Sequence, residues 1–336
     1  MNIDLVPLWA GIIALAVFMY VLLDGFDLGV GMLFGFAPDE SARDLMMASV
    51  APIWDGNETW LVLGSMGLLA AFPAAFAVLM PALYFPILVM LIGLVFRGVA
   101  FEFRVLSGTR QGLWNRAFQW GSLAATYAQG VVLGNYVQGF AVSGREFAGT
   151  SLDWVRPFPL LVGAGLVYGY GLLGACWLVL KTEGHLQQWA RRWALRLLVG
   201  VLAFIAMVSI WTPFMQEGIY RRWFSWPNTA LLAPVPLITA GLAWWAWSSL
   251  RKGRDAAPFL AALGLFAMCY LGLGISLFPL VVPYALTLHQ AAAAPDSQVF
   301  LGLGTLFLLP IILMYTGWSY WVFRGKVRAD AGYGAH

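Results

Sequence analysis

Long apolar segments make up most of this chain, and they limit the folds that it can adopt. The first begins near Val6 and continues to Phe36, which is longer than the ~20 residues that a helix needs to cross a bilayer. Of the 336 residues, 61% are hydrophobic and only 10% are charged, whereas a soluble protein carries about 25% charged residues. The sequence therefore predicts an all-α polytopic membrane protein.

The apolar segments predict nine transmembrane helices. They lie at roughly 7–35, 49–72, 78–103, 115–140, 157–181, 195–217, 229–250, 257–283 and 298–323. The second is the least regular, because Asp55, Asn57 and Glu58 lie in its first turns, and a count of eight stays open if that segment is only half inserted. The loops are too short to fold alone, so we expect a single integral membrane domain.

The basic residues are distributed unevenly between the two sides of these helices. Segments that follow odd-numbered helices carry 14 of the 19 Lys and Arg residues: Arg43, Arg104, Arg110, Arg116, Lys181, Arg191, Arg192, Arg196, Arg251, Lys252, Arg254, Arg324, Lys326 and Arg328. Segments that follow even-numbered helices carry four: Arg145, Arg156, Arg221 and Arg222. The positive-inside rule then predicts a cytoplasmic C-terminus and a periplasmic N-terminus. The net charge of +3 is too small to indicate a nucleic-acid partner.

Two carboxylates lie inside the first apolar segment. On a helix, Asp24 and Asp27 project from one face, beside a surface of glycines. A carboxylate at this depth costs about 2.5 to 3.5 kcal/mol on insertion scales, so we expect these acids to have a role. Arg97, the only basic residue deep in a predicted helix, is the expected partner of one of them. A purely structural ion pair and a role in moving protons or ions both stay open.

Further acids lie near the ends of the second and third predicted helices. Asp55 and Glu58 are one helical turn apart in the segment WDGNETW. They are either acids that complement the positive end of a helix dipole or stepping stones that carry protons inward from the cytoplasm. Glu102 lies near the end of the third helix, and we group it with Arg97 as a structural ion-pair residue.

The histidines limit the cofactors that this chain can hold. There are three: His185 in a loop, His289 at the outer end of the eighth predicted helix, and His336. None lies in the middle of a predicted helix, so the chain cannot supply two histidine ligands to a b-type haem. No zinc spacing, phosphate-binding glycine loop or nucleophilic triad is present. We therefore expect no catalytic or metal-binding residue, and no cofactor bound by this chain alone.

Five segments together resemble subunit II of the cytochrome bd-type ubiquinol oxidases, including the cyanide-insensitive branch. They are DGFDLGVG at 24–31, WDGNETW at 54–60, FRGVAFEFR at 96–104, GISLFP at 274–279 and YTGWSYWVFRGKV at 315–327. The resemblance runs from the first predicted helix to the last. It implies two four-helix bundles plus one peripheral helix. In this chain the first bundle, with the buried acids, would span about 1–140, the second about 157–290, and the last helix 298–323.

The resemblance also implies a function and partners. The chain would be a bacterial inner-membrane protein that pairs with a subunit I carrying b-type and d-type haems and the quinol site. The complex would oxidise quinol, reduce dioxygen to water and take the protons from the cytoplasm. Asp55 is similar to a carboxylate of the family's proton route, Asp24 and Asp27 match the first-helix acids, and Glu58 is added to this predicted pathway. A small single-helix third subunit, lipid and quinone are further candidate partners.

Two other functional classes stay in view. A secondary transporter or ion channel also buries carboxylates near helix breaks, but it is expected to repeat them in both halves, and the second half of this chain is almost bare of charge. A purely structural subunit, whose acids only pair with Arg97, is the third hypothesis. Copurification distinguishes an oxidase subunit from a transporter, because the oxidase subunit should be isolated with a haem-bearing partner and the transporter alone.

Overall fold

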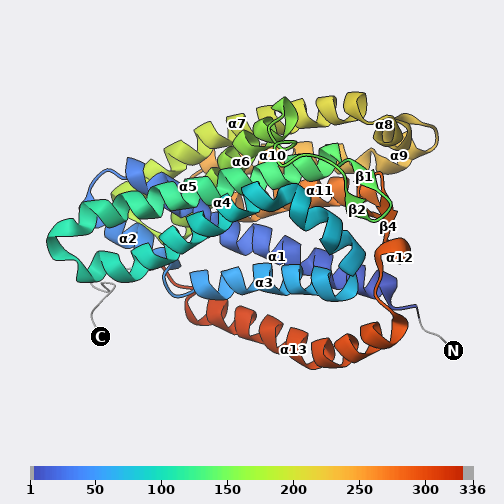
Figure 1. Ribbon diagram of the computed structural model, residues 1–336. Helices are drawn as coiled ribbons and strands as arrows, with labels where there is room; N and C mark the ends of the chain where they lie inside the picture. The colour runs from blue at the N-terminus through green and yellow to red at the C-terminus, as the bar shows by residue number, and fades with distance from the viewer. Residues whose placement is uncertain (1–3, 328–336) are drawn as a thin grey trace.

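Long helices that run roughly along one direction form the molecule. The computed structural model describes residues 4–327, and Figure 1 shows the bundle from one side. Its long helices are α1 (Val6–Leu33), α3 (Trp54–Ala71), α4 (Pro73–Leu106), α5 (Gln111–Gln138), α6 (Pro157–Lys181), α7 (Gly184–Met215), α10 (Pro234–Arg251), α11 (Ala256–Leu277) and α13 (Pro295–Val322). Seven of the described segments are long and apolar enough to cross a membrane, whereas α3 and α5 are more polar. The predicted all-α membrane fold is confirmed, and the count of nine crossings stays a prediction.

Short elements connect these helices. They are η1 (Phe34–Phe36), α2 (Glu40–Val50), η2 (Gly108–Arg110), α8 (Glu217–Phe224), α9 (Asn228–Leu232) and α12 (Leu288–Ala291), with the strands β1 (Val142–Ser143), β2 (Glu146–Phe147), β3 (Leu280–Val282) and β4 (Leu286–Thr287). The strands form two antiparallel hairpins, one before α6 and one after α11. None of the strands belongs to a larger sheet within the described chain.

Several predicted helix boundaries are wrong, each for a local reason. The predicted helix 49–72 begins only at Trp54, because Pro52, which has no backbone N–H to donate, lies in the turn that separates α3 from the shorter α2 before it. The predicted helix 257–283 ends at Leu277, before Pro279, and the chain continues as a hairpin. Helix α7 begins at Gly184 rather than near residue 195. Its early turns bury Leu186, Ala190, Ala194 and Leu198 at every fourth position, a pattern that the arginines between them conceal.

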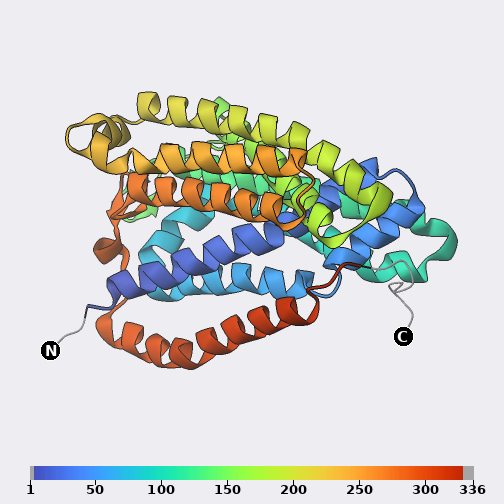
Figure 2. The ribbon, with the colours of Figure 1, turned by 180° about the vertical axis from the view of Figure 1, so that it is seen from behind.

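Helix α1 packs against α3 on one side and against α6 on another (Figure 2). Two glycines allow α1 and α6 to touch. A Cβ atom at Gly29 would lie 1.8 Å from the carbonyl oxygen of Tyr170, and one at Gly174 would lie 2.3 Å from the carbonyl carbon of Gly29. Only glycine permits backbones to approach this closely. The contact fixes the rotation of α1 and therefore the directions in which its acids point.

Helix α13 is peripheral and lies along α3, on the outer side of the bundle (Figures 1 and 2). Its end is fastened to the rest of the molecule by the residues that follow it. The Nζ atom of Lys181 donates to the carbonyl oxygens of Phe323 and Gly325, and the backbone N–H of Val327 donates to the carbonyl oxygen of Lys181 at 2.8 Å. Lys326 also donates to Asp255 at 2.7 Å. These bonds hold the last turns of α13 in place.

The described chain begins and ends at opposite ends of the bundle (Figure 1). We call the end that contains the α4–α5, α6–α7 and α10–α11 connections and the end of α13 the basic end, because most of the basic residues lie there. The first turns of α3, with Asp55 and Glu58, belong to this end.

Candidate functional site

An ion triad joins three helices inside the bundle. The guanidinium of Arg97 on α4 donates from Nη1 to Oδ1 of Asp24 on α1 at 2.5 Å, and from Nη2 to Oε1 of Glu58 on α3. Neither Arg97 nor Asp24 has exposed side-chain surface, and the side chain of Glu58 is 27% exposed. A buried charge is tolerated in a membrane bundle only where it is paired, and here one cation faces two carboxylates.

Local geometry explains how Arg97 reaches both acids. Side chains on a helix point toward its N-terminus, so the guanidinium extends back along α4 toward the middle of the bundle. The ring of Trp54 covers it, with Cζ of Arg97 5.7 Å from the ring centroid. Phe101 stacks on this indole, with 4.8 Å between the ring centroids. The ion triad therefore gains a cation–π contact between Arg97 and Trp54.

Asp27 belongs to a second group of hydrogen bonds. The amide nitrogen Nδ2 of Asn57 donates to Oδ2 of Asp27 at 2.6 Å, and the hydroxyl of Tyr320 donates to Oδ1 of Asn57 at 3.0 Å. Asp27 and Asn57 are each only 1% exposed. The two acids of α1 therefore have different partners: Asp24 faces a fixed cation, and Asp27 faces a neutral amide that a tyrosine of the peripheral helix holds.

Several buried polar atoms around these groups have no partner among the described residues. They are Oδ2 of Asp24, Oδ1 of Asp27, Nε of Arg97 and the hydroxyls of Tyr20 and Tyr170. A buried polar atom without a hydrogen bond costs about 1 to 3 kcal/mol, and internal water commonly supplies the missing bond. The acids of α1 thus lie in a region where water molecules would be bound.

The remaining predicted site residues lie outside these groups. Asp55 is in the first turn of α3, exposed, and its carboxylate makes no hydrogen bond within residues 4–327. Glu102 is exposed on α4, and the structure pairs Arg97 with Asp24 and Glu58, while Glu102 makes no ion pair within residues 4–327.

Sequence reasoning missed the part played by Tyr320. Its partner Asn57 is 263 positions away in the chain, and no local pattern reports such a contact. One signal was available: Thr316, Ser319 and Tyr320 place polar groups at helical spacing on one face of an otherwise apolar helix. Such a face indicates a surface that packs on polar partners.

The histidines of the described residues lie far apart. His185 is exposed in the first turn of α7, and His289 is exposed in α12 at the other end of the bundle, with Nε2 2.9 Å from Oδ2 of Asp4. His336 lies outside the described residues. Between residues 4 and 327 there is no group of three or more His, Cys, Asp or Glu side chains placed to hold a metal ion.

Known proteins resemble this chain over nearly its whole length. Cytochrome bd-I ubiquinol oxidase subunit 2 of Escherichia coli (strain K12) is 28% identical over 362 aligned residues, which cover 96% of this chain and 95% of that protein. Cytochrome bd ubiquinol oxidase subunit 2 of Bacillus subtilis (strain 168) is 30% identical over 341 residues, which cover 95% of this chain and 96% of that protein. The transporter hypothesis finds no support in these matches.

Fold and family agree with these relatives. A chain in the solved structure of bd oxidase from Geobacillus thermodenitrificans superposes with a TM-score of 0.77, at 18% identity, over 96% of this chain and 99% of that chain, which shows a shared fold. The family of cytochrome bd terminal oxidase subunit II matches residues 5–323. The resemblance found in the five sequence segments is therefore confirmed, and the chain belongs to the family of cytochrome bd terminal oxidase subunit II.

Proposed function

We propose that this chain is the haem-free subunit of a bd-type quinol oxidase, and that it supplies part of the path by which cytoplasmic protons reach the site of oxygen reduction. Its relatives are subunits of ubiquinol oxidases, so the complex is a quinol oxidoreductase in which this chain pairs with a subunit I. Reduction of dioxygen adds negative charge to a low-dielectric interior, and protons must compensate that charge. A subunit with buried carboxylates can supply them.

The observation that carries the proposal is a graded series of acids at the basic end. Asp55 is exposed, Glu58 one turn further along α3 is 27% exposed, and Asp24, which shares Arg97 with Glu58, is fully buried. The series leads from the surface to the centre of the bundle. The excess of basic residues at this end favours a cytoplasmic position for it, which is also the side from which we propose that the protons come.

The residues of the series have different tasks in this proposal. The carboxylates of Asp55 and Glu58 take up and release protons. Arg97 stays charged at any working pH and therefore relays nothing, but it holds Glu58 and Asp24 at a fixed separation. Asp27, bound to Asn57, lies one helical turn from Asp24 on α1, nearer to the basic end, and has one oxygen free to accept a hydrogen bond.

The haems and the quinol site are assigned to the partner in this proposal. The b-type and d-type haems there would carry electrons from quinol to dioxygen. The assignment is supported by the two described histidines, His185 and His289, which are both exposed and lie at opposite ends of the bundle. A small single-helix third subunit, lipid and quinone are further proposed partners.

The experiment is a substitution of Asp55 in the complete complex. Asn keeps the shape of Asp but cannot exchange a proton, so D55N should keep the haem content and slow quinol-driven oxygen consumption about tenfold or more, a barrier increase of about 1.4 kcal/mol. D55E should retain part of the activity. The matched control is E102Q, which neutralises another exposed acid of the basic end that does not reach Arg97. Wild-type turnover of an intact D55N complex would remove Asp55 from the pathway.

A further inference from the structure

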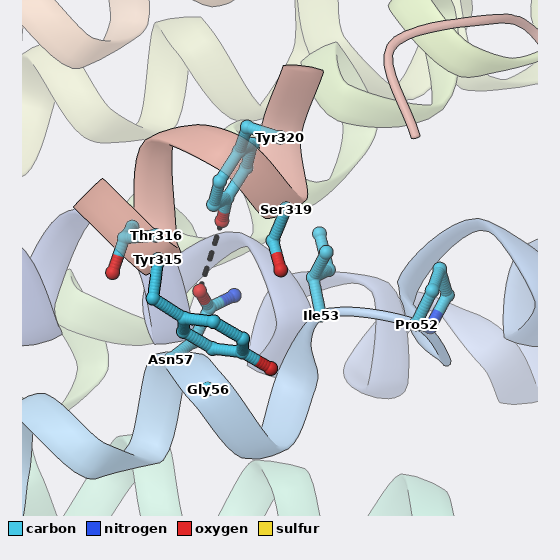
Figure 3. A pocket seen from close by; sticks show the side chains of 8 residues that line it. All are labelled: Pro52, Ile53, Gly56, Asn57, Tyr315, Thr316, Ser319 and Tyr320. Carbon is cyan, nitrogen blue, oxygen red and sulfur yellow. Dashed lines mark hydrogen bonds between the residues drawn. The ribbon is translucent and has the colours of Figure 1, made fainter. Parts of the chain in front are cut away.

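A small pocket lies at the basic end, between the start of α3 and the last turns of α13 (Figure 3). It is lined by Pro52, Ile53, Gly56, Asn57, Tyr315, Thr316, Ser319 and Tyr320. Its volume is about 10 Å³, which is room for about one water molecule. Five of these side chains carry a hydroxyl or an amide, so a water molecule there would find the two to four polar partners that it needs.

Two hydroxyls of the pocket are free to bind a ligand. A hydroxyl on an apolar helix usually donates to the carbonyl of the preceding turn, as Thr212 does to Val208 at 2.7 Å and Thr239 does to Val235 at 2.8 Å. Within residues 4–327, Thr316 and Ser319 make no such bond and no other side-chain hydrogen bond to protein. In Figure 3 the Ser319 hydroxyl points into the space between Tyr320, Ile53 and the Tyr315 ring.

The inner wall of the pocket leads to Asp27. Asn57 forms this wall, and its amide donates to Asp27, whose Oδ1 atom is buried and has no partner among the described residues. The amide is held from two sides, because its Nδ2 also donates to the carbonyl oxygen of Leu23 at 3.4 Å and its Oδ1 accepts from the hydroxyl of Tyr320. None of these contacts involves Asp55 or Glu58.

We propose that this pocket is a water site that forms a second proton inlet, which leads to Asp27 and is separate from Asp55. A protonated water in the pocket gives up its proton, a further water beside Oδ1 of Asp27 passes it on, and the carboxylate becomes a neutral acid until it releases the proton inward. Asn57 and Tyr320 gain and lose no proton. They are positioning residues, because the amide of Asn57 binds one oxygen of Asp27 and leaves the other free, and the Tyr320 hydroxyl holds Asn57 in place.

The proposed inlet depends on the position of α13, and hydrogen bonds from Lys181 hold this helix in place. The last turns of α13 supply four of the eight lining residues, although this helix is otherwise peripheral. The bonds from Lys181 to the carbonyl oxygens of Phe323 and Gly325 fasten the helix just beyond Tyr320. The inference rests on the proposed function, since it assumes that this subunit carries protons.

The test removes the pocket hydroxyls in two backgrounds. The variant T316V/S319A keeps the side-chain volume nearly constant and removes the two free hydroxyls. It is combined with wild-type Asp55 and with D55N, and each complex is purified and assayed. We expect the oxygen consumption that remains in D55N to fall at least tenfold further when T316V/S319A is added, at unchanged haem content. The matched control is T305V, which removes a hydroxyl from the same helix away from the pocket.

The outcomes separate this inference from the proposed function. If D55N is slow and T316V/S319A leaves its remaining turnover unchanged, the inlet does not exist. If D55N turns over like the wild type, Asp55 is not a proton carrier. In that case, loss of activity in T316V/S319A with wild-type Asp55 still supports the proposed inlet. Wild-type activity of T316V/S319A overturns the proposed inlet. Should T316V/S319A lose haem, Y320F replaces it, because it keeps the ring and removes only the bond to Asn57. A larger solvent isotope effect in D₂O is expected for either variant and is not expected from a packing defect.

Discussion

Replacing Arg97 by Met tests whether the ion triad holds the first three long helices together. Met has a similar length and no charge, so the substitution removes the only cation that faces Asp24 and leaves a carboxylate without exposed surface. Breaking a buried ion pair from one side costs about 3 to 5 kcal/mol, which corresponds to about a hundredfold to a few thousandfold in the equilibrium between the assembled and the separated state. We expect R97M to reduce strongly the amount of haem-containing complex that can be purified.

A second substitution makes the reasoning sharper. In R97M/D24N the uncompensated charge is gone, and Glu58 can remain hydrated because it is partly exposed, so assembly should recover in part. The assay is the haem content per complex and the temperature at which the haem spectrum is lost, compared across the double-mutant cycle. R221M is the control, because both partners of the Arg221–Glu217 pair are 75% exposed and such surface pairs contribute little. Equal stability of R97M and R221M, or no recovery in the double variant, would refute the argument.

Three further predictions concern other parts of the chain. A reporter fused after His336 should be cytoplasmic and one fused before Met1 periplasmic, and both on one side would contradict nine crossings. The chain expressed without its partner should show no haem absorption band, and stoichiometric haem would contradict its assignment as haem-free. Partial burial raises the pKa of Asp255, but the bond from Lys326 and the charge of Arg191 outweigh it and hold the pKa below its usual value. The ionised Asp255 therefore stabilises the fold fully at a pH above its pKa in the unfolded chain, about 3.9, and this contribution is lost as the pH falls toward the lower pKa of the folded chain. The difference in unfolding temperature between wild type and D255N should therefore shrink as the pH falls below about 4.

The meeting of α1 and α4 could be predicted from charge alone. Asp24 and Arg97 lie in segments that must be inside an apolar bundle, and unpaired charges there are too expensive to persist. The choice of partner could not be predicted, because Asp24 and Asp27 are on one helix face and the sequence does not show how far α1 is rotated. The contact of Gly29 with Gly174 sets that rotation, and it joins residues 145 positions apart.

The position of Glu58 was harder to predict than that of Asp24. Its place in the first turns of α3 fits both a solvated helix end and an inward-facing ligand, and composition does not distinguish the two. The break at Pro52 decides it, because it starts α3 at Trp54 and so turns Glu58 toward α4 while Asp55 stays exposed. A shift of one residue in the start of a helix rotates each side chain by about 100°, since a turn takes 3.6 residues.

The partners of the two α1 acids suggest which of them exchanges protons. Asp24 is bound to a guanidinium that does not deprotonate, and a cation in direct contact with a carboxylate favours its ionised form. Asp27 is bound to the neutral amide of Asn57, so it can be protonated without leaving a cation behind. Its free oxygen also faces the region where unpartnered buried groups call for water. We therefore infer that Asp24 and Arg97 form the fixed frame of the site, and that Asp27 is the acid of α1 that gains and loses a proton.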